Sequence, residues 1–433
     1  MTRLPNPKVP SLRRRCLLGG ALGATWPLAG WASTARAAEA VSAPADDDRI
    51  SPGRALRFPR DFGSHPGSRT EWWYVTGWLA PSPPSAPPSS ASPSSTSSSG
   101  AMPASAALGF QITFFRSRTD VDRQHPSRFA AQQLLFAHAA ITDLRDPKRP
   151  RLRHDERIAR AGFGVAEAAR DDTRLRLGGW TMTRSGAEPD GPDGAPHSTY
   201  AVRAASDGAG FSMDLQLAST QPVLLQGEAG HSRKGPLVEQ ASHYYSQPQL
   251  ATVGTVRVEG RVLEVAGVAW MDHEWSESLL APDAVGWDWI GMNLFDGRSL
   301  TAFQLRRADG SALWAGGSLR EAPGSRDAPS GRARPGTIPV QGGRSFAPQD
   351  LRFVPGRRWT SALTGARYPV EWTIETPLGR LSVRPLLDAQ ELDSRGSTGS
   401  VYWEGLSELL DAAGRVIGRG YLEMTGYVAP LRL

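Results

Sequence analysis

From residue 70 onward, apolar and polar positions form short runs separated by turn residues. Runs of about five to nine residues rich in Trp, Phe, Val, Ile and Thr are bounded by Gly, Asp and Pro, which is typical of β-strands. A helical period of 3.6 residues is nearly absent, and only Gly405–Leu410 suggests a helical turn. The pattern predicts strands at Glu71–Leu79, Leu108–Arg116, Leu134–Leu144, Tyr200–Ala204, Phe211–Ala218, Thr255–Val258, Val262–Val268, Trp287–Leu294, Ser299–Arg306, Val370–Glu375 and Tyr421–Tyr427.

The order of these strands predicts an all-β fold with two similar units. The string from Trp73 to Gly77, followed after a loop by Phe110-Gln111-Ile112, is echoed by Trp289 to Asn293 followed by Phe303-Gln304-Leu305. Both strings look like the opening hairpin of a barrel. Many short strands separated by turns indicate a sandwich or a barrel. We therefore expect one unit over residues 56–245 and a second over 246–433.

Several segments between the predicted strands have the composition of loops. Residues 81–106 consist mostly of Pro and Ser and cannot form a core or a regular element, so we expect a disordered loop inside a hairpin. Residues 185–197 and 321–345 are further loops, and 38–55 is predicted to be a flexible leader.

The N-terminus has the layout of a secretion signal. Arg13-Arg14-Arg15 precedes an apolar stretch from Leu17 to about Ala32, and Ala35-Arg36-Ala37 provides a small-x-small cleavage site. Paired arginines before an apolar run are typical of the twin-arginine export route, and this apolar run is too weak for a membrane span. The alternative is a basic, disordered N-terminus. We expect residues 1–37 to be removed and the mature chain to be periplasmic or secreted, without a transmembrane segment.

Removal of this signal changes the composition of the protein. The whole chain has 49 basic and 43 acidic residues, and the six basic residues in 1–37, where no acid occurs, account for the difference. The mature chain is thus neutral and lacks the bulk charge of a nucleic-acid-binding protein. Its only cysteine, Cys16, is also lost, which excludes disulfides, cysteine nucleophiles and cysteine metal sites.

The densest group of polar and aromatic residues is the string from Trp270 to Ser276. On a strand, Trp270, Asp272 and Glu274 share one face, whereas Met271, His273 and Trp275 share the other. Further candidates are the string Ser242-His243-Tyr244-Tyr245-Ser246, the string Glu71-Trp72-Trp73-Tyr74, and His138 in an apolar strand.

Three interpretations of these residues remain open. Buried polar groups at strand ends can simply be structural. Alternatively, a carboxyl among Trp and Tyr has its pKa raised by desolvation and can act as an acid, while aromatic faces stabilise a developing cation. A metal site would use Asp272, His273 and Glu274, with or without His243, but alternation separates His273 from the two acids. The chain has no Gly-x-Ser-x-Gly, P-loop or Rossmann motif, and nothing positively supports a secreted hydrolase.

Six strings resemble the family that joins the AttH-like secreted proteins with the carotenoid 1,2-hydratases (hydroxyneurosporene synthases). They cover residues 71–427 in order, and we list them by residue range: 71–77, 110–116, 137–143, 242–246, 270–275 and 420–427. The resemblance implies two consecutive lipocalin-like β-barrels. Barrels of this kind can enclose one apolar ligand.

The hydratase branch of this family adds water to the terminal double bond of an acyclic carotenoid without a cofactor. By motif, the proton-donating Asp of that branch resembles Asp272, and its His resembles His243. The neighbouring aromatic residues are Trp270 and Tyr245 here, where the hydratases carry Tyr and Trp. AttH-like proteins are generally associated with ABC export systems, which implies such a transporter as a partner.

We therefore expect an apolar, isoprenoid- or lipid-like ligand near the junction of the two units, no cofactor and no bound metal. The predicted catalytic residues are Asp272, His243, Tyr245 and Trp270. The predicted ligand-binding residues are Trp72, Tyr74, His138, His273 and Trp275. The alternatives are a non-catalytic carrier or accessory protein of an exporter, and a secreted hydrolase.

Overall fold

A computed structural model describes residues 48–82, 107–122, 124–186, 198–323 and 340–431. Within these ranges the chain consists of β-strands and two 3₁₀ turns, η2 (Arg60–Phe62) and η3 (Pro348–Asp350). The all-β prediction is confirmed. None of the described segments forms a helix with the length and hydropathy needed to cross a bilayer.

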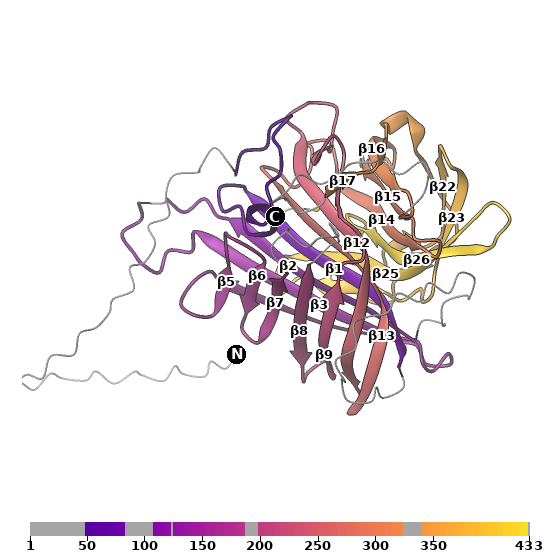
Figure 1. Cartoon of the computed structure of the whole chain (residues 1–433), viewed down its shortest axis with the longest axis horizontal. Coiled ribbons are helices and arrows are strands. Elements are labelled where there is room, and N and C mark those ends of the chain that lie inside the picture. Colours follow the sequence, from indigo (N-terminus) through magenta and orange to yellow (C-terminus); the bar gives the residue numbers. More distant parts are fainter. Residues whose placement is uncertain (1–47, 83–106, 123, 187–197, 324–339, 432–433) are drawn as a thin grey trace, which may run out of the picture. The chain divides into compact units, whose positions relative to one another are not determined.

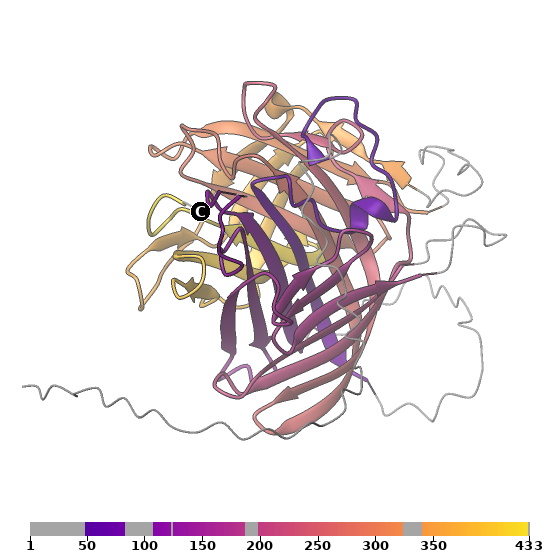
Figure 2. The same ribbon diagram turned by 90° about the vertical axis from the view of Figure 1, so that its left-hand side faces the viewer.

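The first sheet is a nearly closed barrel in which consecutive strands on the main path pair antiparallel (Figures 1 and 2). Its strands, in spatial order, are β4 (Arg151–Arg160), β3 (Gln133–Asp143), β2 (Leu108–Arg118), β1 (Thr70–Pro81), β13 (Arg261–Ser276), β12 (Ala241–Val258), β9 (Phe211–Ala218), β8 (Thr199–Ser206), β7 (Trp180–Ser185), β6 (Arg174–Leu177) and β5 (Ala166–Ala168). Three short strands extend it: β10 (Val223–Leu225) and β11 (His231–Arg233) pair with β12, and β17 (Val340–Gly342) pairs with β10.

The second sheet contains the C-terminal strands, drawn from orange to yellow in Figure 1. Its spatial order is β18 (Arg344–Phe346), β16 (Ala312–Arg320), β15 (Ser299–Arg306), β14 (Gly286–Leu294), β26 (Val416–Met424), β25 (Ser400–Leu410), β23 (Gly379–Pro385), β22 (Trp372–Thr376) and β19 (Arg352–Pro355), with β24 (Glu391–Ser394) paired to β25. A separate hairpin is formed by β20 (Arg358–Thr360) and β21 (Arg367–Pro369).

Side-chain alternation separates the barrel interior from the junction between the sheets. On β1, Trp73, Val75 and Leu79 belong to the apolar core of the first barrel. The intervening residues Tyr74 and Trp78 instead join an aromatic cluster with residues of the second sheet. Because successive strand residues point to opposite faces, a single strand supplies both layers. The core of the first barrel is thus filled by side chains, and the outer face of the same strands meets the second sheet.

A bulge in β12 ties the two sheets together. The pairing of β12 with β13 shifts between Gln247 and Leu250, and Gln249 has a left-handed backbone with φ of 56°. The Gln249 backbone N–H donates to Oδ1 of Asn293 at 2.8 Å, and its side chain donates to the carbonyl oxygens of Leu294 and Arg298. This bulge therefore fixes the first sheet against β14 and the turn that follows it.

Both hairpins of the internal echo form, since β1 pairs with β2 and β14 pairs with β15. The expected division after residue 245 falls inside β12, because β12 and β13 complete the first sheet, and the second sheet begins with β14. Gly405–Leu410, the segment whose pattern came nearest to a helical turn, lies in β25, where it pairs with β26.

Parts of the expected leader and loops lie outside the described residues, as does the whole signal at 1–37. The described part of the leader is anchored rather than free. Asp48 is buried and accepts hydrogen bonds from Arg60 and from the Gly67 backbone N–H. Arg54 forms an ion pair with Asp61. The segment from Asp48 onward therefore belongs to the folded body.

Candidate active site

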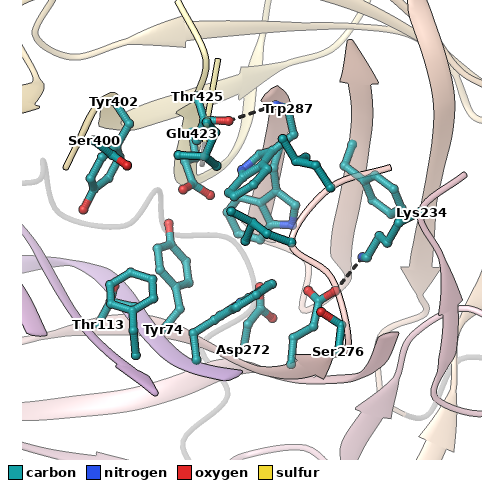
Figure 3. Close-up of a pocket in the computed structure, with 18 of the residues that line it drawn as sticks. Tyr74, Thr113, Lys234, Asp272, Ser276, Trp287, Ser400, Tyr402, Glu423 and Thr425 are labelled. Atoms are coloured by element: carbon teal, nitrogen blue, oxygen red, sulfur yellow. Dashed lines mark hydrogen bonds and ion pairs between the residues drawn. The ribbon is translucent and has the colours of Figure 1, made fainter. Parts of the chain in front are cut away.

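A cavity opens between the two sheets, with walls that are mainly aromatic (Figure 3). The space inside it that the centre of a water-sized sphere can reach is about 120 Å³. We call the first-sheet wall the floor; it includes Trp72, Tyr74, Phe115, His138, Tyr244, Asp272 and Glu274. We call the second-sheet wall the roof; it includes Trp287, Trp289, Phe303, Leu305, Tyr402, Glu404 and Glu423.

Asp272 lies on the floor and is held by three donors. Tyr244 donates its hydroxyl proton to Oδ2 at 2.7 Å. Ser246 and the Trp270 indole N–H donate to Oδ1 at 2.5 and 2.7 Å. This arrangement follows from strand register, because Ser246 on β12 is directly opposite Asp272 on β13. The donors fix the orientation of the carboxyl group and favour its ionised form.

Burial opposes these donors. Asp272 has almost no exposed surface, and desolvation raises its pKa to about 7 although the Ser246, Tyr244 and Trp270 hydrogen bonds lower it. A carboxyl with a pKa near neutrality changes its charge in the pH range where most enzymes work. Asp272 can therefore either give or take a proton at neutral pH.

Two further carboxyl groups face the cavity from the roof. Glu404 and Glu423 are directly opposite each other in the β25–β26 pair, and both line the cavity. Burial and the charge of Glu423 raise the pKa of Glu404 well above its usual range. Burial raises the pKa of Glu423 to about 7, with Asp272 and Glu274 adding to the increase. No ion pair joins Asp272, Glu404 or Glu423 to a cation within the described residues.

Lys234, which also lines the cavity, is paired with a fourth carboxyl group, that of Glu274. Lys234 Nζ lies 3.0 Å from Oε1 of Glu274, and the ammonium also lies over the rings of Tyr244 and Phe303. Figure 3 shows Lys234 at one side of the group, Ser400 and Thr113 at the opposite side, and Glu423 between them. The lysine is therefore committed to Glu274 and to aromatic faces.

The opposite face of the same strands carries a closed network of charges. Glu71 contacts Nδ1 of His65 at 2.8 Å, Nε2 of His273 at 2.9 Å and Nε of Arg116 at 2.6 Å. Burial alone would raise the pKa of Glu71, but Arg116 and the two histidines hold it well below its usual range. Asp61 completes the network at Nε2 of His65, 3.0 Å away.

This network brings the potential ligand atoms of His65, Glu71 and His273 within 4.8 Å of one another. However, Arg116 already supplies a positive charge to Glu71, and both histidine rings have hydrogen-bond partners at each nitrogen. We therefore interpret these residues as a buried ion-pair network that supports the floor from behind, and not as a metal centre. The combination of Asp272, His273 and Glu274 considered from the sequence does not assemble, because His273 points to this face.

The structure separates the residues predicted from sequence into two groups. Asp272, Trp72, Tyr74 and His138 line the cavity, and Trp270 supports Asp272 from the side. Alternation turns four others away from the cavity to the network face: His243, Tyr245, His273 and Trp275. Tyr245 Oη lies 2.9 Å from Nδ1 of His273, and Trp275 stacks on His65 with ring centroids 3.7 Å apart.

His243 is the clearest of these cases. Its register partner on β13 is Trp275, and its Nε2 accepts a hydrogen bond from the Ser51 backbone N–H at 3.4 Å. Burial lowers the pKa of His243 to about 4, with Arg54 adding to the effect. A neutral histidine that anchors the N-terminal segment is not positioned to act on a ligand together with Asp272.

His138 closes one end of the cavity by joining the sheets. Its Nδ1 lies 2.7 Å from Tyr402 Oη, and its Nε2 lies 2.9 Å from Oγ of Ser397. Burial lowers the pKa of His138 to about 3, so the ring is neutral. Glu156 accepts hydrogen bonds from the backbone N–H groups of Gly396 and Ser397 in the same turn. His138 thus has a supporting position in the wall.

Sequence reasoning missed Tyr244, Ser246, Glu404, Glu423 and Lys234. The first two belong to the string that was singled out for His243, but they lie one and three residues after it, and an odd offset puts them on the opposite face of the strand. The two glutamates had a usable signal, because each is an acid inside an otherwise apolar strand run. Lys234 precedes β12 in a loop and carried no signal.

Comparison with known proteins identifies the family. The model of the AttH-like family matches residues 100–427, which is most of the chain. The chain belongs to the AttH-like family. A crystal structure of a Nitrosomonas europaea protein described as an AttH is 41% identical to this AttH-like chain, with a TM-score of 0.70, and the match covers 88% of this chain and 99% of that one. The resemblance recognised in the sequence motifs is confirmed.

A more distant structure shares the fold. Kievitone hydratase from Nectria haematococca superposes with a TM-score of 0.56 at 13% identity, covering 87% of this chain and 94% of that one. At this identity the likeness shows the fold alone. Among proteins with curated descriptions, none matches this sequence closely enough to count as a relative.

Proposed function

We propose that this AttH-like protein is a cofactor-independent acid–base enzyme that binds an apolar ligand between its two sheets and adds or removes water at a double bond. The observation that carries the proposal is the presence of three cavity carboxyl groups, Asp272, Glu404 and Glu423, without a cationic partner among the described residues. Placing such groups in an apolar cavity costs stability, and a site that only wrapped an apolar molecule would be more stable with apolar residues there.

The surroundings of these groups fit the chemistry of a hydro-lyase. Protonation of an alkene gives a carbocation, and the faces of Tyr74, Tyr244 and Trp289 can stabilise it. Hydration also needs a base for the attacking water, and a carboxyl with a pKa near neutrality can serve as acid or base. The predominantly aromatic walls favour an isoprenoid-like or other lipid-like ligand over a charged one.

The proposal places this reaction outside the cytoplasm. Its basis is the twin-arginine signal expected at residues 1–37. Under the alternative hypothesis, the protein is a carrier that works with an ABC exporter, and its cavity binds the ligand without converting it. Ligand turnover therefore distinguishes the two functions.

Hydration is tested with neurosporene and kievitone as probes, each incubated with the purified protein in H₂¹⁸O. We expect a product that has gained one labelled water, and no such product with Asp272→Asn. The control is His243→Gln, which changes the network face and should keep turnover. A probe that binds to the wild type without gaining label would support a carrier, and equal turnover by Asp272→Asn would remove Asp272 from the reaction.

A further inference from the structure

The roof of the cavity holds a pair of acids that one strand register forces together. Glu404 and Glu423 are cross-strand partners, and directly opposed side chains have Cβ atoms about 4.5–5.5 Å apart. Glu404 is buried and Glu423 is half-buried, while Lys234 is engaged with Glu274. Two carboxylates that face each other from paired strand positions in a buried cavity repel one another, which favours retention of a proton by the pair at neutral pH.

A buried hydroxyl connects this pair to the cavity. Tyr74 lines the floor, and Figure 3 shows its hydroxyl pointing toward the roof near Glu423. Burial and the neighbouring Glu404 raise the pKa of Tyr74 well above its usual range, while the Tyr74 hydroxyl lowers the pKa of Glu404. Neither Tyr74 Oη nor Glu404 Oε1 has a hydrogen-bond partner of good geometry within the described residues. A buried polar group without a partner is uncommon in a folded protein. Both atoms can therefore bond a water or a ligand group inside the cavity.

The donors around Asp272 have fixed directions. The Tyr244 hydroxyl oxygen accepts from the Trp289 indole N–H at 3.3 Å, and the Ser246 hydroxyl oxygen accepts from the Gln226 amide at 2.8 Å. Each hydroxyl can accept in this way while directing its own proton to Asp272. Asp272 is thus surrounded by hydrogens, whereas Glu404 faces another acid and its Oε1 has no well-aligned donor among the described residues.

We propose that Glu404 is the general acid of the cavity and Asp272 its general base, an assignment that rests on the hydration proposed above. In the forward direction the Glu404 O–H bond breaks and its proton forms a C–H bond with one alkene carbon. The π electrons leave the other carbon, which forms a C–O bond with water, and Asp272 takes the proton that this water loses. A proton then returns from Asp272 to Glu404 through solvent at the open mouth, and neither a cofactor nor an oxidant is consumed.

The groups that face Glu404 and Asp272 determine the pH at which each carboxyl loses its proton. Glu423 is a positioning residue, because its charge keeps the proton on Glu404. Around Asp272 the facing groups are Tyr244, Glu274 with Lys234, and Glu423. Around Glu404 they are Glu423 and the hydroxyls of three tyrosines that are neutral at pH 7, Tyr74, Tyr402 and Tyr421.

The assignment is tested by infrared difference titration of the purified protein between pH 5 and pH 9, which detects the C=O stretch of neutral carboxyl groups without any ligand. At pH 8 the wild type should keep one such band. Glu404→Gln should lose this band, and Asp272→Asn should keep it. Glu423→Gln should lower the pH at which Glu404 titrates by roughly one to three units, because it removes a neighbouring negative charge. The matched control is Glu408→Gln on the same strand, whose native carboxyl is already paired with Arg384.

Three results would overturn the assignment. The first is that the wild type has no neutral carboxyl band at pH 8. The second is that the band persists in Glu404→Gln but disappears in Asp272→Asn. The third is that Glu404 titrates at the same pH in Glu423→Gln as in the wild type. Far-ultraviolet circular dichroism identifies any variant that does not fold, and Glu423→Gln then tests the pair with Glu404 intact. If the bands behave as expected but neither neurosporene nor kievitone is hydrated by the wild type, the hydration and the catalytic roles fail while the protonation order stands.

Discussion

Replacing Asp272 by Asn should change how the stability of the protein depends on pH. The pKa of Asp272 is about 7 in the folded protein, against 3.8 for an unperturbed aspartate. At pH values between these two, the folded state holds a proton that the unfolded chain has lost. Stability must therefore fall as the pH rises from 3.8 to about 7, and it levels off above that.

The size of this effect follows from the shift. One pKa unit corresponds to about 1.4 kcal/mol. A shift from 3.8 to about 7 then corresponds to about 4 kcal/mol, of which about 3 kcal/mol is lost between pH 5 and pH 8. The amide introduced by Asp272→Asn cannot titrate, so the variant lacks this loss. An amide also satisfies Tyr244, Ser246 and Trp270 less well, but that cost is the same at every pH and does not affect the slope.

The measurement is urea denaturation at pH 5, 6, 7 and 8, followed by tryptophan fluorescence. The wild type should lose about 3 kcal/mol more than Asp272→Asn over this interval. The control is Asp214→Asn on β9, where the native carboxylate is surface-exposed and paired with Arg203. Parallel pH curves for the wild type and Asp272→Asn, within about 0.5 kcal/mol, would refute the reasoning that burial raises the pKa of this carboxyl.

Four other changes test separate parts of the structure. Arg116→Met leaves the Glu71 carboxylate buried without its guanidinium and should lower the free energy of unfolding by about 3–5 kcal/mol in urea denaturation, so a loss below about 1 kcal/mol would contradict the network. Gln249→Ala removes two hydrogen bonds between the sheets and should cost about 1–3 kcal/mol in the same measurement, with no loss arguing against the bulge as a tie. Tyr244→Phe removes a donor to the carboxylate of Asp272, so the infrared titration of Asp272 should move to higher pH, and a downward shift would be inconsistent with that bond. Replacing Arg13 and Arg14 by lysine should retain the protein in the cytoplasm in cell fractionation, whereas unchanged export would exclude the twin-arginine route.

Strand alternation was sufficient to predict part of the site from sequence. It placed Asp272 and His273 on opposite faces of β13, and the structure has them there, with one toward the cavity and the other toward Glu71. The same rule applied to the string from Ser242 to Ser246 separates His243 from Tyr244. The register between β12 and β13 decides whether His243 or Tyr244 lies on the same side of the sheet as Asp272. This register cannot be read from either strand alone.

The remaining errors have a similar cause. Glu404 lies next to a segment whose short apolar pattern resembled a helical turn, and only the long-range pairing of β25 with β26 makes it a strand with Glu423 opposite. The division between the units was placed too early because β12 and β13 follow the first unit in sequence and complete its sheet by pairing with β9 and β1. Local composition predicts the existence of strands, whereas partners far away in sequence decide their sheet.

The two-faced construction of β13 has a consequence for redesign of this protein. The cavity face of β13 cannot be varied freely, because Asp272 and Glu274 both flank His273, which is bonded to Glu71 in the charged network behind them. The roof is backed in two ways. Ile290, Ala302 and Leu422 of the apolar core lie behind much of it, whereas Asp288, between Trp287 and Trp289, is buried in an ion pair with Arg306. An engineer seeking a new ligand should therefore randomise roof positions that are flanked by apolar core residues, and leave the floor and the segment around Asp288 intact.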